Sequence, residues 1–179
     1  TVCHSLKGGV GSASRQVELD GKTYTLGVLV QSNHGSLKDL RIDGRPAGRM
    51  IDAALNASAP DKGSIISIMA TDIPLSSRQL ERVLKRASVG LARLGSFIGH
   101  GSGEVMLGFT TANRMPHDSE TQLLPFHALA ESKIDLLFRA MAEAEEEAVL
   151  NSMLTAQTVT GFDGTTKRSL SEFIGQIFA

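Results

Sequence analysis

Three stretches of the chain have the short, continuous hydrophobic character of buried β-strands. The first, Lys22 to Gln31 (KTYTLGVLVQ), follows the turn signal Asp20-Gly21. The second, Ser64 to Asp72 (SIISIMATD), ends before Pro74, and the third is Glu104 to Ala112 (EVMLGFTTA). Runs of this length that are rich in Val, Ile, Thr and aromatic residues, and are bounded by Gly or Pro, predict strands.

A helical spacing of apolar residues begins after the second of these strands. Ser76 followed by Gln79 has the sequence of a capping box. Apolar residues then recur every three or four positions from Leu80 to Leu94, and Gly95 is a natural C-terminal stop. We predict one helix over this stretch.

Two more helices are expected nearer the C-terminus. The longer one covers residues 129–154, and its EAEEEA run (143–148) is interpreted as a solvated face. The tail repeats the pattern, with Ser169 and Glu172 as capping residues and an apolar stripe of Leu170, Phe173, Ile174 and Ile177.

The remaining segments favour loops. Residues 43–63 are rich in Gly, Pro, Ala, Asp and Asn and are interpreted as a loop or linker. The glycine-rich Lys7 to Arg15 (KGGVGSASR) lacks the preceding strand and the Gly-Lys-Ser/Thr ending of a phosphate cradle, so a tight structural loop is expected. The resulting order of strand, strand, helix, strand, helix, helix indicates a layered α/β or α+β domain without the βαβ alternation of a Rossmann fold.

Composition excludes some classes of partner. The 179 residues carry a net charge of -1, so no excess of positive charge favours nucleic acid or anionic lipid. No apolar run reaches the roughly 20 residues that span a bilayer. The chain has no Trp and one Tyr, which argues against surfaces that stack bases. We therefore expect neither a nucleic-acid partner nor a membrane partner.

The chain begins TVCHSLKGGVGSASR, without Met and without the pattern of a signal peptide. We expect it to be the C-terminal part of a longer precursor. Its compartment, cytoplasmic or periplasmic, stays open.

Neither a metal nor a cofactor is expected from the spacing of possible ligands. Cys3 is the single cysteine, and Cys3-His4 alone does not make a zinc site. His34 and His100 stand beside Gly in predicted loops, where a surface position is expected. No pair is found at metal-ligand spacing among the five histidines, His4, His34, His100, His117 and His127.

Polar residues at the predicted strand ends are candidates for chemistry. Ser102 and Glu104 are two residues apart, so both side chains should point to one face of the third strand. They can orient a nucleophile from a neighbouring strand, or simply be polar residues at a strand end. Asn33, just past the first strand, can donate to an oxyanion or belong to a plain turn. Ser64, directly after Gly63, is either the start of a strand or a nucleophile.

Several segments, taken in order, resemble the family of L-aminopeptidase/D-amidase-esterases and β-peptidyl aminopeptidases. They are KGGVGSASR, YTLGVLVQSNHG, GSIISIMATDIPLSSRQLERVLKRASVGLARLGS, GSGEVMLGF and TGFDG. Together they run over almost the whole chain, which makes the resemblance more specific than any single motif. It implies a four-layer αββα sandwich, similar in architecture to N-terminal-nucleophile hydrolases, with a topology like that of ornithine acetyltransferase.

The resemblance also implies roles for residues. In that family the precursor cuts itself before a Ser, which becomes the N-terminal nucleophile of the smaller subunit. The match is Ser64, so the Gly63-Ser64 bond is the expected cleavage site. Residues 1–63 then end the larger subunit, and residues 64–179 form the smaller one. The family's supporting residues match Ser102 and Glu104, and its oxyanion Asn matches Asn33. Either the freed amine or the Ser102/Glu104 pair can act as the base.

The implied function is a self-processing serine aminopeptidase or amidase that acts on peptides, amino-acid amides or esters without a cofactor. Its implied partners are the missing N-terminal part of the larger subunit and copies of itself, as a tetramer of processed heterodimers. One departure is Phe162 in TGFDG, where the family pattern has Arg. Two alternatives remain, an acyltransferase of the ornithine-acetyltransferase type and a non-catalytic relative that acts as a binding or assembly module.

Overall fold

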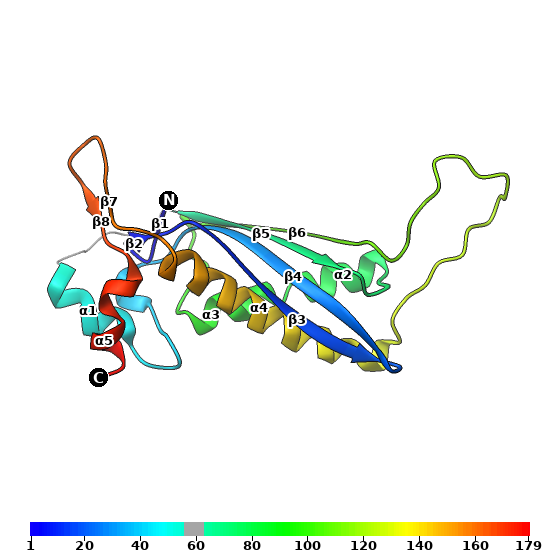
Figure 1. The fold of residues 1–179 in the computed structure, drawn as a ribbon, viewed down its shortest axis with the longest axis horizontal. Coiled ribbons are helices and arrows are strands. Elements are labelled where there is room, and N and C mark those ends of the chain that lie inside the picture. Colours follow the sequence, from blue (N-terminus) through cyan, green and yellow to red (C-terminus); the bar gives the residue numbers. More distant parts are fainter. Residues whose placement is uncertain (56–62) are drawn as a thin grey trace.

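A twisted four-stranded sheet is the centre of the structure (Figure 1). The structure is a computed structural model that describes residues 1–55 and 63–179, except for the side chains of 52–54. The strands lie in the order β3-β4-β5-β6. Antiparallel pairing joins β3 to β4 and β4 to β5, whereas β5 and β6 are parallel. The bounds are Val10–Leu19 for β3, Lys22–Asn33 for β4, Ser64–Thr71 for β5 and Gly103–Thr110 for β6.

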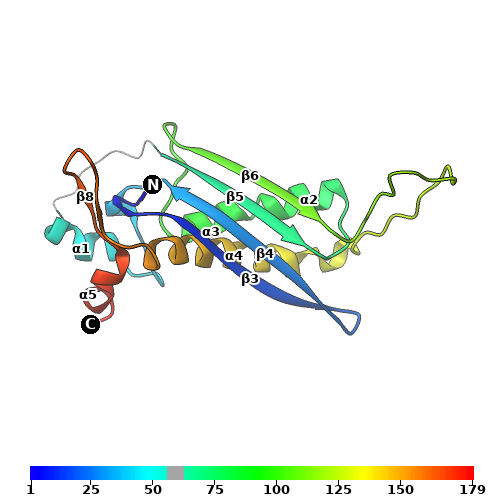
Figure 2. The ribbon, with the colours of Figure 1, turned by 45° about the horizontal axis from the view of Figure 1, so that its top comes forward.

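Helices cover one face of this sheet (Figure 1; Figure 2). The parallel β5–β6 connection passes through two of them, because parallel neighbours need a crossover rather than a tight hairpin. These two helices are α2 (Ser77–Leu84) and α3 (Ala87–Arg93). The third helix, α4 (Ile134–Leu154), packs against β3 and β4.

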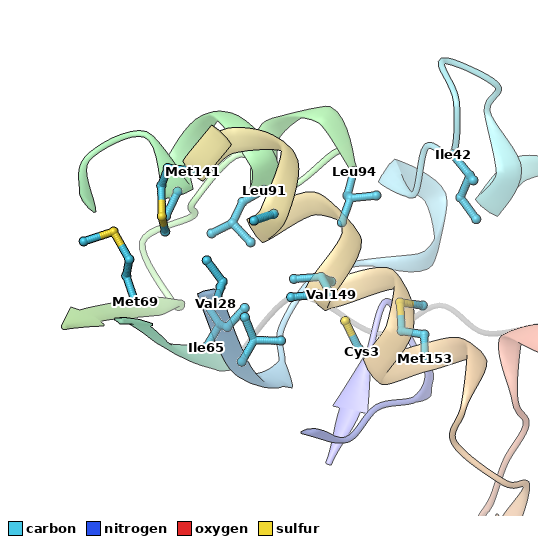
Figure 3. Close-up of a cluster of buried hydrophobic side chains, with 14 of the residues drawn as sticks. Cys3, Val28, Ile42, Ile65, Met69, Leu91, Leu94, Met141, Val149 and Met153 are labelled. Carbon is cyan, nitrogen blue, oxygen red and sulfur yellow. The ribbon is translucent and has the colours of Figure 1, made fainter. Parts of the chain in front are cut away.

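The hydrophobic core lies between the sheet and these helices. Alternation along β5 buries Ile65, Ser67 and Met69 on the helix side, as the pleat of a strand requires. Figure 3 shows the sheet side chains of Val28, Ile65 and Met69 facing helix side chains that include Leu91, Leu94, Met141 and Val149.

The opposite face of the sheet, here called the open face, is apolar but uncovered among the described residues. Five of its side chains are between 44% and 56% exposed: Leu29, Ile66, Val105, Leu107 and Phe109. They are contiguous, since Ile66 is paired with Val105, and Ile68 with both Leu29 and Leu107. A stripe of large apolar side chains across three strands is unusual for a surface that faces water.

Smaller elements gather at one end of the sheet (Figure 1). They include two 3₁₀ turns, at Leu37–Asp39 and Leu170–Phe173. The others are β1 (Val2–Cys3), β2 (Leu6–Lys7), α1 (Ala47–Leu55), β7 (Val159–Thr160), β8 (Thr166–Lys167) and α5 (Ile174–Ile177). At the other end, the segment between β6 and a further 3₁₀ turn, Glu131–Lys133, extends far from the body (Figure 1). No helix in the described ranges has both the length and the apolar character needed to cross a bilayer.

The three predicted strands are confirmed, with shifts of one or two residues at their ends. The capping box is present, because the Ser76 side chain accepts from the backbone N–H of Gln79 and the Gln79 side chain accepts from the N–H of Ser76. The single helix expected from Ser76 to Gly95 is wrong, since the helix stops at Leu84 and restarts at Ala87. This break lets α2 pack near β6 while α3 packs on α4.

Two segments expected to be loops contain regular structure. Residues 43–63 include helix α1, whose buried Ala47 and Ile51 pack into the core, while 56–62 lie outside the described residues. The glycine-rich Lys7 to Arg15 is mostly strand, because it begins β3. Small residues there have weak strand propensity on their own, but they let the strand pack closely on α4, and this tertiary contact outweighs the local preference.

The acidic run of α4 is only partly solvated. Glu143 and Glu147 pair with Arg15, and Glu146 pairs with Arg93. Glu145, in contrast, is completely buried and accepts a 2.6 Å hydrogen bond from the Ser67 hydroxyl. The interpretation of this run as a solvated face is therefore wrong for Glu145, because α4 turns that position toward the sheet.

Candidate active site

Strand register brings the sequence candidates to one end of the sheet. Asn33 is the last residue of β4, Ser64 is the first of β5, and Gly103 is the first of β6. Asn33 is paired with Ser64, and Ser64 is paired with Gly103. The three residues therefore form a row across three strands, although they lie far apart in the sequence.

Asn33 and Ser64 project from the open face. Both are exposed, and alternation places Ser64 on the same side as Ile66. Directly opposed residues of antiparallel strands have Cβ atoms about 4.5–5.5 Å apart, so the amide and the hydroxyl are neighbours. On the other side of Ser64, a Cβ built on Gly103 would lie 3.3 Å from the Ser64 Oγ. The glycine thus leaves the hydroxyl accessible from that side.

The orientation of the Asn33 amide is fixed by the chain's N-terminal strand. The backbone N–H of Val2 donates to the Asn33 Oδ1 at 2.9 Å. Because the oxygen takes this bond, the Nδ2 amino group is turned away from Val2 and becomes available as a donor. A donor held by the backbone in this way suits the stabilisation of an oxyanion. Sequence reasoning missed the role of Val2, since a backbone N–H leaves no signal in the sequence.

Ser102 and Glu104 form a pair beside this row. The Ser102 hydroxyl donates to Glu104 Oε1 at 2.9 Å, which agrees with the prediction that the two side chains share a face. Glu104 is aligned with Ile65, so the pleat directs the pair toward the side opposite the Ser64 hydroxyl. The pair is thus one strand away from Ser64, at the end where β5 begins.

Gly63 is confined by its contact with the end of β4. A Cβ on Gly63 would lie 1.7 Å from the Asn33 carbonyl oxygen and 2.7 Å from the Asn33 carbonyl carbon. A side chain at this position would therefore displace the backbone. The close approach explains why a glycine precedes Ser64, and it places the 63–64 peptide beside Asn33.

Two expectations about this region are wrong. Asn33 ends strand β4 rather than following it, because β4 runs two residues further than predicted. His34 is buried rather than at the surface, and it meets Cys3 and His4, which are also buried. Sequence spacing could not predict this cluster, because the β1–β2 hairpin and the end of β4 are distant in sequence and come together only in the folded chain. His100 is exposed as expected.

Comparison with known families identifies the family to which the chain belongs. The model of peptidase family S58 matches residues 1–167, which is most of the chain. This chain belongs to peptidase family S58.

Individual S58 relatives and solved structures are similar over nearly the full chain. A β-peptidyl aminopeptidase BapA of Sphingosinicella microcystinivorans is 40% identical over 182 residues, covering 94% of this chain and 46% of the relative. The PH0078 protein of Pyrococcus horikoshii OT3 superposes with a TM-score of 0.86 at 47% identity, covering 98% of this chain and 48% of that protein.

The third comparison concerns the fold class. The L-aminopeptidase D-Ala-esterase/amidase of Ochrobactrum anthropi is described as a prototype of the serine aminopeptidases and a variant of the Ntn-hydrolase fold. It superposes with a TM-score of 0.84 at 35% identity, covering 94% of this chain and 47% of that one. The mixed α/β class expected from the sequence is confirmed. The chain spans about half the length of the relatives that it matches.

Proposed function

We propose that the protein containing this S58 chain is a self-processing serine aminopeptidase in which Ser64 is the nucleophile. The observation that carries the proposal is the row formed by Asn33, Ser64 and Gly103 across the end of the sheet. It combines a hydroxyl at the start of a strand, an amide donor beside it and a glycine that leaves room for a substrate. The similarity to serine aminopeptidases supports the same role.

Self-cleavage would act on the Gly63-Ser64 peptide bond. The Ser64 hydroxyl attacks the Gly63 carbonyl carbon, the peptide C–N bond breaks, and the acyl group moves from nitrogen to oxygen as an ester. Water then hydrolyses the ester, which leaves a carboxylate at Gly63 and a free amine and hydroxyl at Ser64. The contact of Gly63 with Asn33 supports this step, because it holds the scissile peptide next to the amide donor.

In turnover the freed Ser64 attacks the carbonyl of a substrate's N-terminal residue. The Asn33 Nδ2 donates to the oxyanion, the leaving amine departs with a proton, and water hydrolyses the acyl-enzyme. A Ser hydroxyl is a weak nucleophile and needs a base. The new α-amine, whose ordinary pKa is about 7.7–8.0, is one candidate for that base.

The Ser102–Glu104 pair is the other candidate. Once the bond before Ser64 is cut, the first residue of β5 is held on its C-terminal side only, so its amine and hydroxyl can rotate. Rotation around the strand end would bring either group toward the pair on the neighbouring strand. The carboxylate would then accept a proton through Ser102 or stabilise the charged amine.

The open face supports a four-layer arrangement. We propose that a second sheet with its own helices, supplied by the rest of the protein, covers Leu29, Ile66, Val105, Leu107 and Phe109. Two sheets packed face to face lie about 10 Å apart and bury such side chains. Residues 1–63 and 64–179 would then be parts of the larger and smaller subunits of one sandwich, and processed heterodimers would assemble further.

Substrates of the proposed enzyme are short peptides, amides or esters with a free N-terminal residue. The similarity to β-peptidyl aminopeptidases favours testing β-amino acids as well as α-amino acids in that position. Hydrolysis is favoured over acyl transfer, because the matched relatives are named as aminopeptidases and Ser64 stands where acyltransferases of the related type usually have Thr.

The test uses the full-length protein with a panel of aminoacyl p-nitroanilides and short β-peptides. We expect release of p-nitroaniline or of the N-terminal residue, and loss of that activity in Ser64→Ala. A folded Ser64→Ala variant with wild-type turnover would contradict the proposal. Ser67→Ala is unsuitable as a control, because Ser67 bonds Glu145, so Ser14→Ala, at an exposed position of β3, serves instead.

A further inference from the structure

Three side chains that bind transition metals meet between the β1–β2 hairpin and the end of β4. Cys3 and His4 have no exposed surface, and His34 is 2% exposed. One ligand atom from each lies within 4.8 Å of the corresponding atom of the other two. Cys3 Sγ lies 4.0 Å from His34 Nδ1. Cys3 also belongs to the hydrophobic core (Figure 3).

His4 makes the kind of hydrogen bond to a backbone carbonyl that metal-ligating histidines typically make. Its Nδ1 lies 3.0 Å from the Ser36 carbonyl oxygen. A carbonyl oxygen only accepts, so Nδ1 must carry the proton and Nε2 must carry the lone pair. Histidines that ligate metals typically donate the second ring N–H to a carbonyl or carboxylate in this way, which fixes both the tautomer and the orientation of the ring.

The backbone around the cluster is shaped to hold the His4 ring inside. His4 and Ser5 form the turn between β1 and β2, with φ of 46° and 64°. Two-residue hairpin loops commonly take positive φ at both positions, and His is one of the non-glycine residues enriched in this conformation. A Cβ on Gly35 would lie 2.5–2.7 Å from three atoms of the His4 ring. The glycine thus provides the space that the ring occupies.

We propose that Cys3, His4 and His34 form a binding site for a divalent cation of the zinc class. Zinc accepts a mixed thiolate and imidazole set, with bonds of about 2.3 Å to sulfur and 2.0–2.1 Å to nitrogen. These bonds place tetrahedral ligands roughly 3.3–3.6 Å apart, so the ligand atoms would have to approach one another by at most about 1.5 Å. Sites with three protein ligands complete the tetrahedron with water or a small anion.

The metal would fasten the N-terminal hairpin to the strand end that carries Asn33. The hairpin already joins that strand through the His4 N–H, which donates to the His34 carbonyl at 2.8 Å. Val2, one residue before Cys3, orients the Asn33 amide. A metal bound here therefore stabilises the backbone next to the proposed oxyanion donor. The site itself does not depend on the proposed activity and can be tested without it.

The experiment measures metal in the full-length protein. The wild type, Cys3→Ser, His4→Asn and the exposed control His117→Ala are incubated with zinc, desalted, and analysed by mass spectrometry of the elements. Asn is chosen at position 4 because it tolerates positive φ. Cobalt(II) is then substituted for zinc, since a thiolate ligand gives a charge-transfer band in the near ultraviolet. Circular dichroism checks that each variant is folded.

We expect about one zinc per chain in the wild type and in His117→Ala, and none in either ligand variant. The cobalt band should be present in the wild type and lost in Cys3→Ser. A chelator should lower the melting temperature of the wild type but not of Cys3→Ser, because metal binding is coupled to folding. Metal-free wild type after zinc loading, or equal zinc in folded Cys3→Ser, would overturn the proposal and leave the cluster as a buried hydrogen-bonded group.

Discussion

Replacement of the buried Glu145 by Gln should make the protein more stable at neutral and alkaline pH. Burial against the sheet raises the pKa of Glu145 from 4.5 to about 7, although the hydrogen bond from Ser67 acts in the opposite direction. The folded state therefore favours the protonated carboxyl. Gln has nearly the same shape as that neutral form, and its carbonyl oxygen can still accept from Ser67.

The size of the effect follows from this difference in pKa. One pKa unit corresponds to about 1.4 kcal/mol, so an increase from 4.5 to about 7 amounts to about 3 kcal/mol. Below pH 4.5 the carboxyl is protonated in both the folded and the unfolded chain. Between pH 4.5 and 7 the folded state holds more protons, so the stability contributed by Glu145 falls as pH rises. Above pH 7 the carboxyl is ionised in both states, so the stability lost through Glu145 no longer changes with pH.

The assay is denaturation by urea from about pH 4 to pH 8. It is performed in a Ser64→Ala background, so that any self-cleavage is blocked in all samples. The difference in unfolding free energy between Glu145→Gln and its parent cancels the titration of other groups and should grow by about 3 kcal/mol across the range. The neighbouring Glu147→Gln, which removes a surface pair with Arg15, is the matched surface control. A difference for Glu145→Gln that does not change with pH would refute the reasoning.

The remaining predictions concern the proposed site. Asn33→Asp keeps the oxygen that accepts from Val2 but removes the amide donor. We therefore expect kcat to fall by at least about 10²–10³-fold without loss of the fold. An unchanged kcat would show that Asn33 has a structural role only. Glu104→Gln and Ser102→Ala should each lower kcat by about 10²–10⁴-fold. Their double mutant should be little worse than either single variant, whereas additive losses would show that the two act independently. Gly63→Ala should slow self-cleavage, because its Cβ would overlap the Asn33 carbonyl oxygen, and processing at the wild-type rate on denaturing gels would contradict this.

The sequence predicted the parts of the fold that are encoded locally. Continuous apolar runs identified β4, β5 and β6, and the Ser76 capping box identified the start of α2. Strand β3 was missed because its small residues have weak strand propensity, and the strand is supported by pairing with β4 and by contact with α4. The burial of Glu145 was missed for a related reason, since the side of α4 that faces the sheet includes one position of an acidic run.

The candidate site shows the same division. The resemblance singled out Asn33, Ser64, Ser102 and Glu104, but strand register is what brings three strand ends together. The Val2 N–H and the Cys3–His4–His34 cluster depend on contacts across 30 or 31 residues, which single-sequence reasoning does not detect.

The most direct test of the account is the mass of the mature full-length protein, together with its N-terminal sequences. Mass spectrometry should find one fragment that ends at Gly63 and a second that starts at Ser64, while Ser64→Ala remains a single chain. A fully active wild-type enzyme with an intact bond between residues 63 and 64 would contradict the central claim that Ser64 acts as a freed N-terminal nucleophile.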